Sequence, residues 1–202
     1  AWAGSSPYQG MKLMASHFGG SRNPMVVQWP AQIKHDGQVR SQFHHCNDLV
    51  PTIYEAVGIT PPDLVNGIEQ DEIDGTSFAY TFDDPQADGQ LKTQYFEIMG
   101  SRSLYHDGWM ASAIGPRLPW VKGVDPAILQ WSPDDDTWEL YNIDEDWSQA
   151  HDLAGEMPDK VAQLKDMFLV EATKNQALPI GGGLWIPVFH PEMRIKPSQT
   201  EW

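Results

Sequence analysis

The apolar residues of this chain follow two different spacings, and the first half contains both. Residues 25–29 form a short, nearly continuous apolar run that ends at Pro30. Such a run is typical of a strand that is buried on both faces of a sheet. Within residues 49–57 the apolar positions fall on one face of a helix, which an Asn-Asp pair can cap and Gly58 can end. A buried strand followed by a helix predicts an α/β arrangement.

The second half contains short β-rich runs and one long helical segment. Gly100 separates the first run from the second, and Asp107-Gly108, a strong hairpin sequence, separates the second from the third. The apolar positions of residues 158–174 form one helical stripe that begins with a proline, which a first helical turn accepts. We expect a small antiparallel sheet with this helix packed across it. The four runs cover residues 94–99, 101–106, 109–113 and 137–141.

Changes in composition divide the chain into four parts. Residues 1–60 hold the predicted strand and helix, and residues 61–92 are acidic with few periodic positions, which predicts an extended surface linker. Residues 93–180 hold the antiparallel sheet and its helix, and residues 181–202 form an extended tail rich in glycine and proline. The predicted fold class is therefore α/β, with a small α+β subdomain in the second half.

The chain is strongly acidic, with 13 Lys and Arg against 28 Asp and Glu and a formal net charge of −15. This charge argues against nucleic acid and anionic membrane as general partners, since both require a basic surface. The sequence has no apolar run of the roughly 18 residues that a membrane-spanning helix needs. Cys46 is the only cysteine, so neither an internal disulfide nor a cysteine-based zinc site is expected.

Basic and titratable side chains are concentrated near the start of this acidic chain. Lys12, His17 and Arg22 fall within eleven residues, and Gly19-Gly20 bends the backbone between them. An anionic ligand would have to be met by a local positive site, and this segment is the best candidate for one. For Arg22 itself we favour a structural ion pair with an acidic residue of the core.

The other polar clusters favour structural roles. His44-His45 with Asp48 suggests a metal site, but adjacent residues of an extended segment point to opposite sides, so only one histidine could face an ion. Arg102 lies near the start of a predicted strand, and we interpret it as an ion-paired sheet residue rather than one that reaches a site. Residues 134–136 are three aspartates without the spacing and glycine of a calcium loop, which predicts a solvated loop.

Several short segments occur in a specific order along the chain. Lys12 is followed by Gly-Gly-Ser-Arg-Asn-Pro-Met-Val-Val-Gln-Trp-Pro at residues 19–30 and by Asp-Leu-Val-Pro-Thr-Ile at residues 48–53. The later segments are Gln-Tyr-Phe-Glu (94–97), Ser-Arg-Ser-Leu-Tyr (101–105), Asp-Gly-Trp (107–109), Trp-Glu-Leu-Tyr-Asn (138–142) and Asp-Leu-Ala (152–154). In this order they resemble the carboxyl-terminal half of sulfatases of the bacterial arylsulfatase type.

The resemblance implies an alkaline-phosphatase-like α/β fold and the hydrolysis of sulfate esters. Sulfatases use a formylglycine, made from the Cys or Ser of a C/S-x-P-x-R motif, beside a calcium ion held by Asp and Asn ligands. This motif is absent here, because Cys46 is followed by Asn-Asp-Leu-Val. The formylglycine and the calcium ligands are therefore expected upstream, and residues 1–60 would be the end of the large catalytic domain.

The chain is either a fragment or a degenerate relative of the family, and we favour a fragment that is inactive by itself. Its partners would be the sulfate ester substrate and the upstream catalytic part of the same parent chain. Many members of the family are exported, and the compartment stays unassigned, with the bacterial periplasm and secretion as the candidates.

Lys12 is the one catalytic residue that the resemblance transfers, as the family's lysine that contacts the sulfate oxygens. His17 stands where the family has an aromatic or small residue before its Gly-Gly pair. We assign His17 as candidate lining of the pocket entrance, with a hydrogen-bonded structural histidine as the alternative. Calcium is implied as the cofactor, and no metal ligand is assigned within this chain.

Two other functions stay open at this stage. A phosphodiesterase or phosphatase of the same superfamily would use two metal ions and needs Asp and His ligand pairs, which the seven histidines do not show. A non-catalytic glycan-binding or interaction module would use exposed tryptophans as a sugar platform, and would require residues 25–27 to pair within this chain. The candidate platform residues are Trp109, Trp120, Trp131, Trp138 and Trp147.

Overall fold

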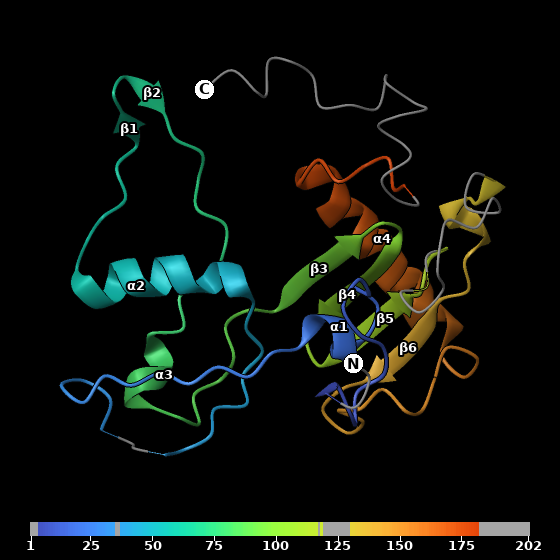
Figure 1. Ribbon diagram of the computed structural model, residues 1–202, viewed down its shortest axis with the longest axis horizontal. Coiled ribbons are helices and arrows are strands. Elements are labelled where there is room, and N and C mark those ends of the chain that lie inside the picture. The colour runs from blue at the N-terminus through green and yellow to red at the C-terminus, as the bar shows by residue number, and fades with distance from the viewer. Residues whose placement is uncertain (1–3, 35–36, 117, 119–129, 182–202) are drawn as a thin grey trace. The chain divides into compact units, whose positions relative to one another are not determined.

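The computed structural model of the protein describes residues 4–34, 37–116, 118 and 130–181 (Figure 1). The chain divides into two compact units. The groove unit is Pro24–Lys92, and the sheet unit combines Ala1–Asn23 with Thr93–Trp202. Within the described ranges, no helix has the length and apolar character needed to cross a membrane.

One helix dominates the groove unit. Helix α2 spans Leu49–Val57, directly after the 3-10 turn η2 at Cys46–Asp48. Gly58 ends α2 in the left-handed conformation, with φ of 68°. The predicted helix and its glycine stop are therefore confirmed. The remaining elements are a two-stranded hairpin of β1 (Leu64–Val65) and β2 (Ile68–Glu69), and the short helix α3 (Tyr80–Asp83).

Asp48 and Thr52 tie α2 to the segment that follows the hairpin. The buried carboxylate of Asp48 accepts hydrogen bonds from the amides of His45 and Thr76, both at 2.8 Å. The hydroxyl of Thr52 accepts one from the amide of Phe78 at 2.9 Å. The bonds to Thr76 and Phe78 join residues 28 and 26 positions apart and hold the core of this unit together.

The structure differs from two expectations for this unit. Residues 61–92 are more than a surface linker, because Phe78 and Phe82 are buried and supply its core. Residues 25–29 form no strand, and Val26 is 94% exposed. A strand buried on both faces needs neighbouring strands that pair its backbone and cover its side chains, and the described residues of this unit offer none.

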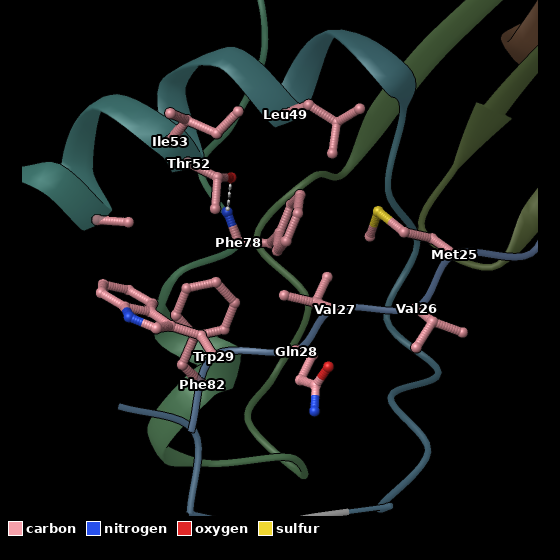
Figure 2. A pocket seen from close by; sticks show the side chains of 11 residues that line it. Met25, Val26, Val27, Gln28, Trp29, Leu49, Thr52, Ile53, Phe78 and Phe82 are labelled. Carbon is pink, nitrogen blue, oxygen red and sulfur yellow. Dashed lines mark hydrogen bonds between the residues drawn. The ribbon is translucent and has the colours of Figure 1, made fainter. Parts of the chain in front are cut away.

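Residues 25–29 instead line an apolar groove, which they share with one face of α2 (Figure 2). The groove has a volume of about 480 Å³. Val26 and Val27 line one side, and Leu49 and Ile53 of α2 line the other. All of these side chains are at least partly exposed. The apolar face that the sequence predicted for α2 is therefore present but not covered by the described part of this unit.

The sheet unit is built on a four-stranded antiparallel sheet in the order β3-β4-β5-β6. Met99-Gly100 and Asp107-Gly108 join its first three strands, and all four residues have positive φ, as two-residue type I′ hairpin turns require. The predicted sheet is confirmed. Its strands are β3 (Thr93–Ile98), β4 (Ser101–His106), β5 (Trp109–Ala113) and β6 (Glu139–Asn142).

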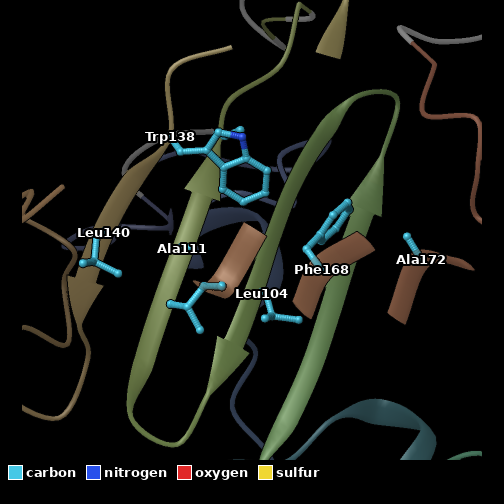
Figure 3. Packing of buried hydrophobic residues seen from close by; sticks show 8 residues of the cluster. Leu104, Ala111, Trp138, Leu140, Phe168 and Ala172 are labelled. Atoms are coloured by element: carbon cyan, nitrogen blue, oxygen red, sulfur yellow. The ribbon is translucent and has the colours of Figure 1, made fainter. Parts of the chain in front are cut away.

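Helix α4 (Pro158–Lys174) packs across one face of this sheet, as predicted (Figure 3). Pro158 occupies its first turn and Lys174 its last, where a cation is favourable. Phe168 lies edge-on to Trp138, with ring centroids 5.7 Å apart. The buried core of this face is Leu104, Ala111, Ala113, Trp138, Leu140, Leu164, Phe168 and Ala172.

The other face of the sheet is covered by the start of the chain. Side chains alternate along a strand, so Ser101 and Ser103 point away from α4. Residues 14–18 are buried against these serines, and the short helix α1 (Phe18–Ser21) follows. Residues 1–23 therefore group with the sheet, whereas the sequence analysis grouped them with residues 24–60.

Candidate functional site

Lys12 lies on a tight turn of residues 11–14, within the segment that covers the sheet. The amide of Met14 donates to the carbonyl of Met11 at 3.1 Å and closes this turn. Leu13 adopts φ of 81°, a left-handed conformation that a residue with a side chain rarely takes. Met14 is buried whereas Lys12 is exposed. The turn thus holds an ammonium group out in solvent on an anchored backbone.

The Gly19-Gly20 pair packs directly against this turn. A Cβ on Gly20 would lie 1.9 Å from the carbonyl oxygen of Met14, and one on Gly19 would lie 2.3 Å from that of Gly10. The Gly19 amide donates to the carbonyl of Gln9 at 2.8 Å. The two glycines are therefore needed because two backbone segments approach closely, and they lie within α1 rather than in an open turn.

His17 is buried, with 2% of its surface exposed. Its Nδ1 lies 2.9 Å from the hydroxyl of Ser16, and its ring lies edge-on to that of Tyr141. Its Nε2 is 3.1 Å from a carboxylate oxygen of Glu139, a close contact without the direction of a hydrogen bond. The structure thus places His17 inside the sheet unit, and its assignment as pocket lining stays a prediction without support from this geometry.

Tyr141 and Glu139 are the β6 residues that contact the His17 ring. The Tyr141 hydroxyl donates to Glu139 at 3.1 Å. Burial, and then the neighbouring Glu139 carboxylate, raise the pKa of Tyr141 far above its usual value, since both disfavour the phenolate. Tyr141 therefore remains a neutral donor to Glu139 over the physiological pH range.

Arg102 is an ion-paired sheet residue, as the sequence predicted. Its Nη1 lies 2.6 Å from the carboxylate of Asp136, and its Nη2 donates to the carbonyl of Pro133 at 2.7 Å. Its guanidinium lies 5.0 Å from the centre of the Trp138 ring. Asp136 also accepts from the indole of Trp131 at 2.7 Å, just after the 3-10 turn η4 (Pro133–Asp135). The predicted solvated loop is therefore wrong for Asp136, because this carboxylate neutralises a buried cation.

Within the described part of the chain, the guanidinium of Arg22 lies over two aromatic rings and is not ion-paired as predicted. It is 5.3 Å from the centre of the Tyr8 ring and 5.4 Å from that of Phe18. Such cation–π contacts have a structural role here, since both rings belong to the segment that carries Lys12.

The histidine pair of the groove unit is not assembled as a metal site. His44 packs on the ring of Phe78 at 4.9 Å, with its Nδ1 3.8 Å from Asp48. Burial lowers the pKa of His44, although Asp48 partly opposes this effect. His45 instead contacts the side-chain oxygen of Asn47 at 2.7 Å.

Calcium does not fit the residues that the structure describes. They contain no group of three or more His, Cys, Asp or Glu side chains that could hold a metal ion. A calcium ion takes six to eight oxygen ligands, several of them carboxylates. No step of a reaction is therefore assigned to a metal within this part of the chain.

The four described tryptophans of the candidate platform lie in different surroundings. Trp138 is buried in the core under α4, and Lys160 lies over the ring of Trp109 at 5.6 Å. Trp131 is hydrogen-bonded to Asp136, whereas Trp147 is exposed. Trp120 lies outside the described residues. Trp138 is therefore removed from the candidate sugar platform, and the glycan-binding alternative stays a prediction.

The residues that hold the Lys12 segment in place were missed by the sequence analysis. They are Ser101, Ser103 and Gln149, which are buried and contact residues 15–18. Two serines at alternate positions of a predicted strand face the same side, and this pattern could have indicated a polar contact surface. No local pattern marks Gln149.

The fold of the sheet unit belongs to a known structural class. A four-stranded antiparallel sheet with one helix packed across it is similar to the carboxyl-terminal subdomain of sulfatases. The mixed α/β chain therefore has a sulfatase-like fold over most of its length, as expected.

The solved structures define this likeness. A Bacteroides thetaiotaomicron sulfatase, BT33336S-sulf, from a study of glycosaminoglycan metabolism, matches with a TM-score of 0.56 and 18% identity. The match covers 83% of this chain but 32% of that chain, so this chain spans a minor part of the sulfatase it matches. A second structure, Ps i-CgsB, matches with a TM-score of 0.46 and 17% identity over 75% of this chain and 29% of that one. No family model matches this chain.

Proposed function

We propose that this chain is the carboxyl-terminal part of a sulfuric-ester hydrolase and that Lys12 contacts the sulfate group of the substrate. The observation that carries this proposal is the exposed Lys12 ammonium on an anchored turn, in a chain with a sulfatase-like fold. The motif order around Lys12 supports the same role. The upstream part of the parent chain would supply the remaining catalytic groups.

The chemistry of Lys12 suits a sulfate ester. An ammonium group carries a full positive charge and three donors, so it can bind sulfate oxygens from several directions. Negative charge develops on the departing oxygen and on the sulfate as the ester bond breaks. A fixed cation next to this charge stabilises the transition state more than the ground state.

The nucleophile and the metal ion of such an active site would come from the upstream part of the parent chain. Formylglycine would supply the nucleophile and calcium would balance the charge of the sulfate. Neither the motif for the first nor a ligand cluster for the second is found in the described part of the chain. We therefore limit the role of this chain to binding and charge stabilisation through Lys12.

The test is an assay of the full-length parent protein on an aryl sulfate. Lys12→Ala is expected to lower turnover by about 10²–10³, the usual effect of losing one donor to a developing oxyanion. Lys34→Ala is the matched control, because Lys34 is also an exposed lysine but belongs to the groove unit. Wild-type turnover in Lys12→Ala would overturn the role of Lys12, and turnover of aryl phosphate alone would favour a phosphatase instead.

A further inference from the structure

The segment that carries Lys12 is held on the sheet by side chains rather than by a strand ladder. The hydroxyl of Ser101 accepts hydrogen bonds from two successive amides, those of Ala15 at 3.0 Å and Ser16 at 3.1 Å. The hydroxyl of Ser103 donates to the carbonyl of Ala15 at 2.6 Å. Both serines are fully buried, so water does not compete for these bonds.

Gln149 completes this attachment from the loop that follows β6. Its side-chain oxygen accepts from the amide of Phe18 at 2.8 Å, and its side-chain nitrogen donates to the carbonyl of Ser16 at 3.3 Å. One amide group thus pairs with the peptide groups on both sides of His17, as a neighbouring strand would. Its backbone carbonyl also accepts from the side chain of Gln9. Gln149 is completely buried.

The loop that presents Gln149 is itself well ordered by hydrogen bonds. Gln149 adopts φ of 59°, and its amide donates to the carbonyl of Asp146 at 3.1 Å. The carboxylate of Asp146 accepts from the amide of His151 at 2.8 Å and from the hydroxyl of Ser148 at 3.1 Å. The side-chain amide of Gln149 is therefore held in one orientation.

Gln149 forms hydrogen bonds with residues on both sides of the Lys12 turn. Gln9 precedes the turn and Ser16 follows it, and Met14, the last residue of the turn, is buried. We infer that Gln149 is a positioning residue that fixes the Lys12 turn, acting through Gln9, Ser16 and Phe18. The part of this inference that concerns catalysis rests on the proposed function of Lys12.

Hydrogen exchange tests the positioning without reference to activity. In the full-length protein, Gln149→Met keeps the side-chain volume but removes both hydrogen bonds. Amides of residues 8–22 are then expected to exchange on the order of tenfold faster or more, since local opening sets their rate, while those of α4 stay protected. Gln149→Glu should restore part of the protection, because its carboxylate still accepts from the Phe18 amide.

Hydrogen exchange of a control variant shows whether the effect is specific to Gln149. Gln163→Met changes an exposed glutamine of α4 and should leave residues 8–22 unchanged. Equal loosening of residues 8–22 and α4 in Gln149→Met would show a general core role and overturn the inference. Unchanged exchange in residues 8–22 would overturn it as well.

A double-mutant cycle tests the catalytic consequence. Gln149→Met should lower kcat/KM on an aryl sulfate by about tenfold or more, since a misplaced catalytic group is costly. In a Lys12→Ala background the same change should have no further effect, because Gln149 acts through Lys12. If the losses of kcat/KM in the two single variants add up in the double variant, Gln149 does not act through Lys12. If Lys12→Ala alone has wild-type turnover, the proposed function fails, and the exchange pattern still decides whether Gln149 holds the turn.

Discussion

Gly20 shows how a single residue sets the position of a functional group. It lies in α1, where alanine is ordinarily favoured over glycine by about 1 kcal/mol. A Cβ at this position would however approach the carbonyl oxygens of Met14 and Met11 to 1.9 and 2.7 Å. Both are backbone atoms of the Lys12 turn, so they cannot move away without displacing the turn. The steric cost is therefore expected to exceed the gain in helix propensity.

We expect Gly20→Ala to lower the free energy of unfolding by about 1–3 kcal/mol, as overpacking of a close contact does. Urea denaturation measures this change. Gly155→Ala is the control, because no atom lies within 4 Å of the added methyl group, and its effect should stay within about 0.5 kcal/mol. A Gly20→Ala protein as stable as the wild type would contradict the close approach of the two segments.

At the scale of elements, the two faces of the four-stranded sheet are covered in different ways. On one face, a cluster of apolar side chains packs under α4. The other face carries Ser101, Ser103 and Ser112, all buried, and is covered by an irregular segment through hydrogen bonds. The first face therefore stabilises the unit, while the second determines where the Lys12 segment lies.

Helix α4 offers a matched pair of substitutions for the first of these roles. Phe168 is 1% exposed in the core, whereas its neighbour Leu169 is 51% exposed. Phe168→Ala should destabilise the protein by about 3–5 kcal/mol, because it leaves a cavity between the helix and the sheet. Leu169→Ala should change the free energy of unfolding by no more than about 0.5 kcal/mol. Similar losses in the two variants, measured by urea denaturation, would mean that α4 is rotated from the orientation described.

At the scale of the whole molecule, the groove unit leaves a large apolar surface uncovered by its own described residues. Val26 and Ile53 line the groove and are mostly exposed. Exposed apolar patches of this kind are uncommon on soluble monomers and promote association. The acidic surface, with a net charge of −15, opposes such association through repulsion.

We expect the 202-residue chain, produced by itself, to bind a hydrophobic dye through this groove. Val26→Lys should reduce the fluorescence of an uncharged hydrophobic dye, because a dye that fills the groove would have to displace water from the ammonium group. Val39→Lys is the control, since Val39 is 81% exposed but does not line the groove. Equal fluorescence in the two variants would place the dye site elsewhere on the chain.

Elements with local hydrogen bonds were predictable from the sequence alone. The spacing of apolar residues and Pro158 defined α4, Gly58 ended α2, and Asp107-Gly108 marked a hairpin. Each of these signals acts over a few residues, because helices and tight turns pair backbone groups that are close in the chain. The order of motifs likewise singled out Lys12, whose function stays a prediction.

Only the tertiary structure showed what holds Lys12 in place. Gln149 contacts Phe18 across 131 positions of sequence, and no local pattern can report such a pairing. The apolar run at residues 25–29 predicted a strand, but a strand exists only where another strand pairs with its backbone, and the described residues supply no such neighbour. The amino-acid sequence thus determined the local elements and the candidate cation, whereas contacts between distant segments decided how that cation is presented.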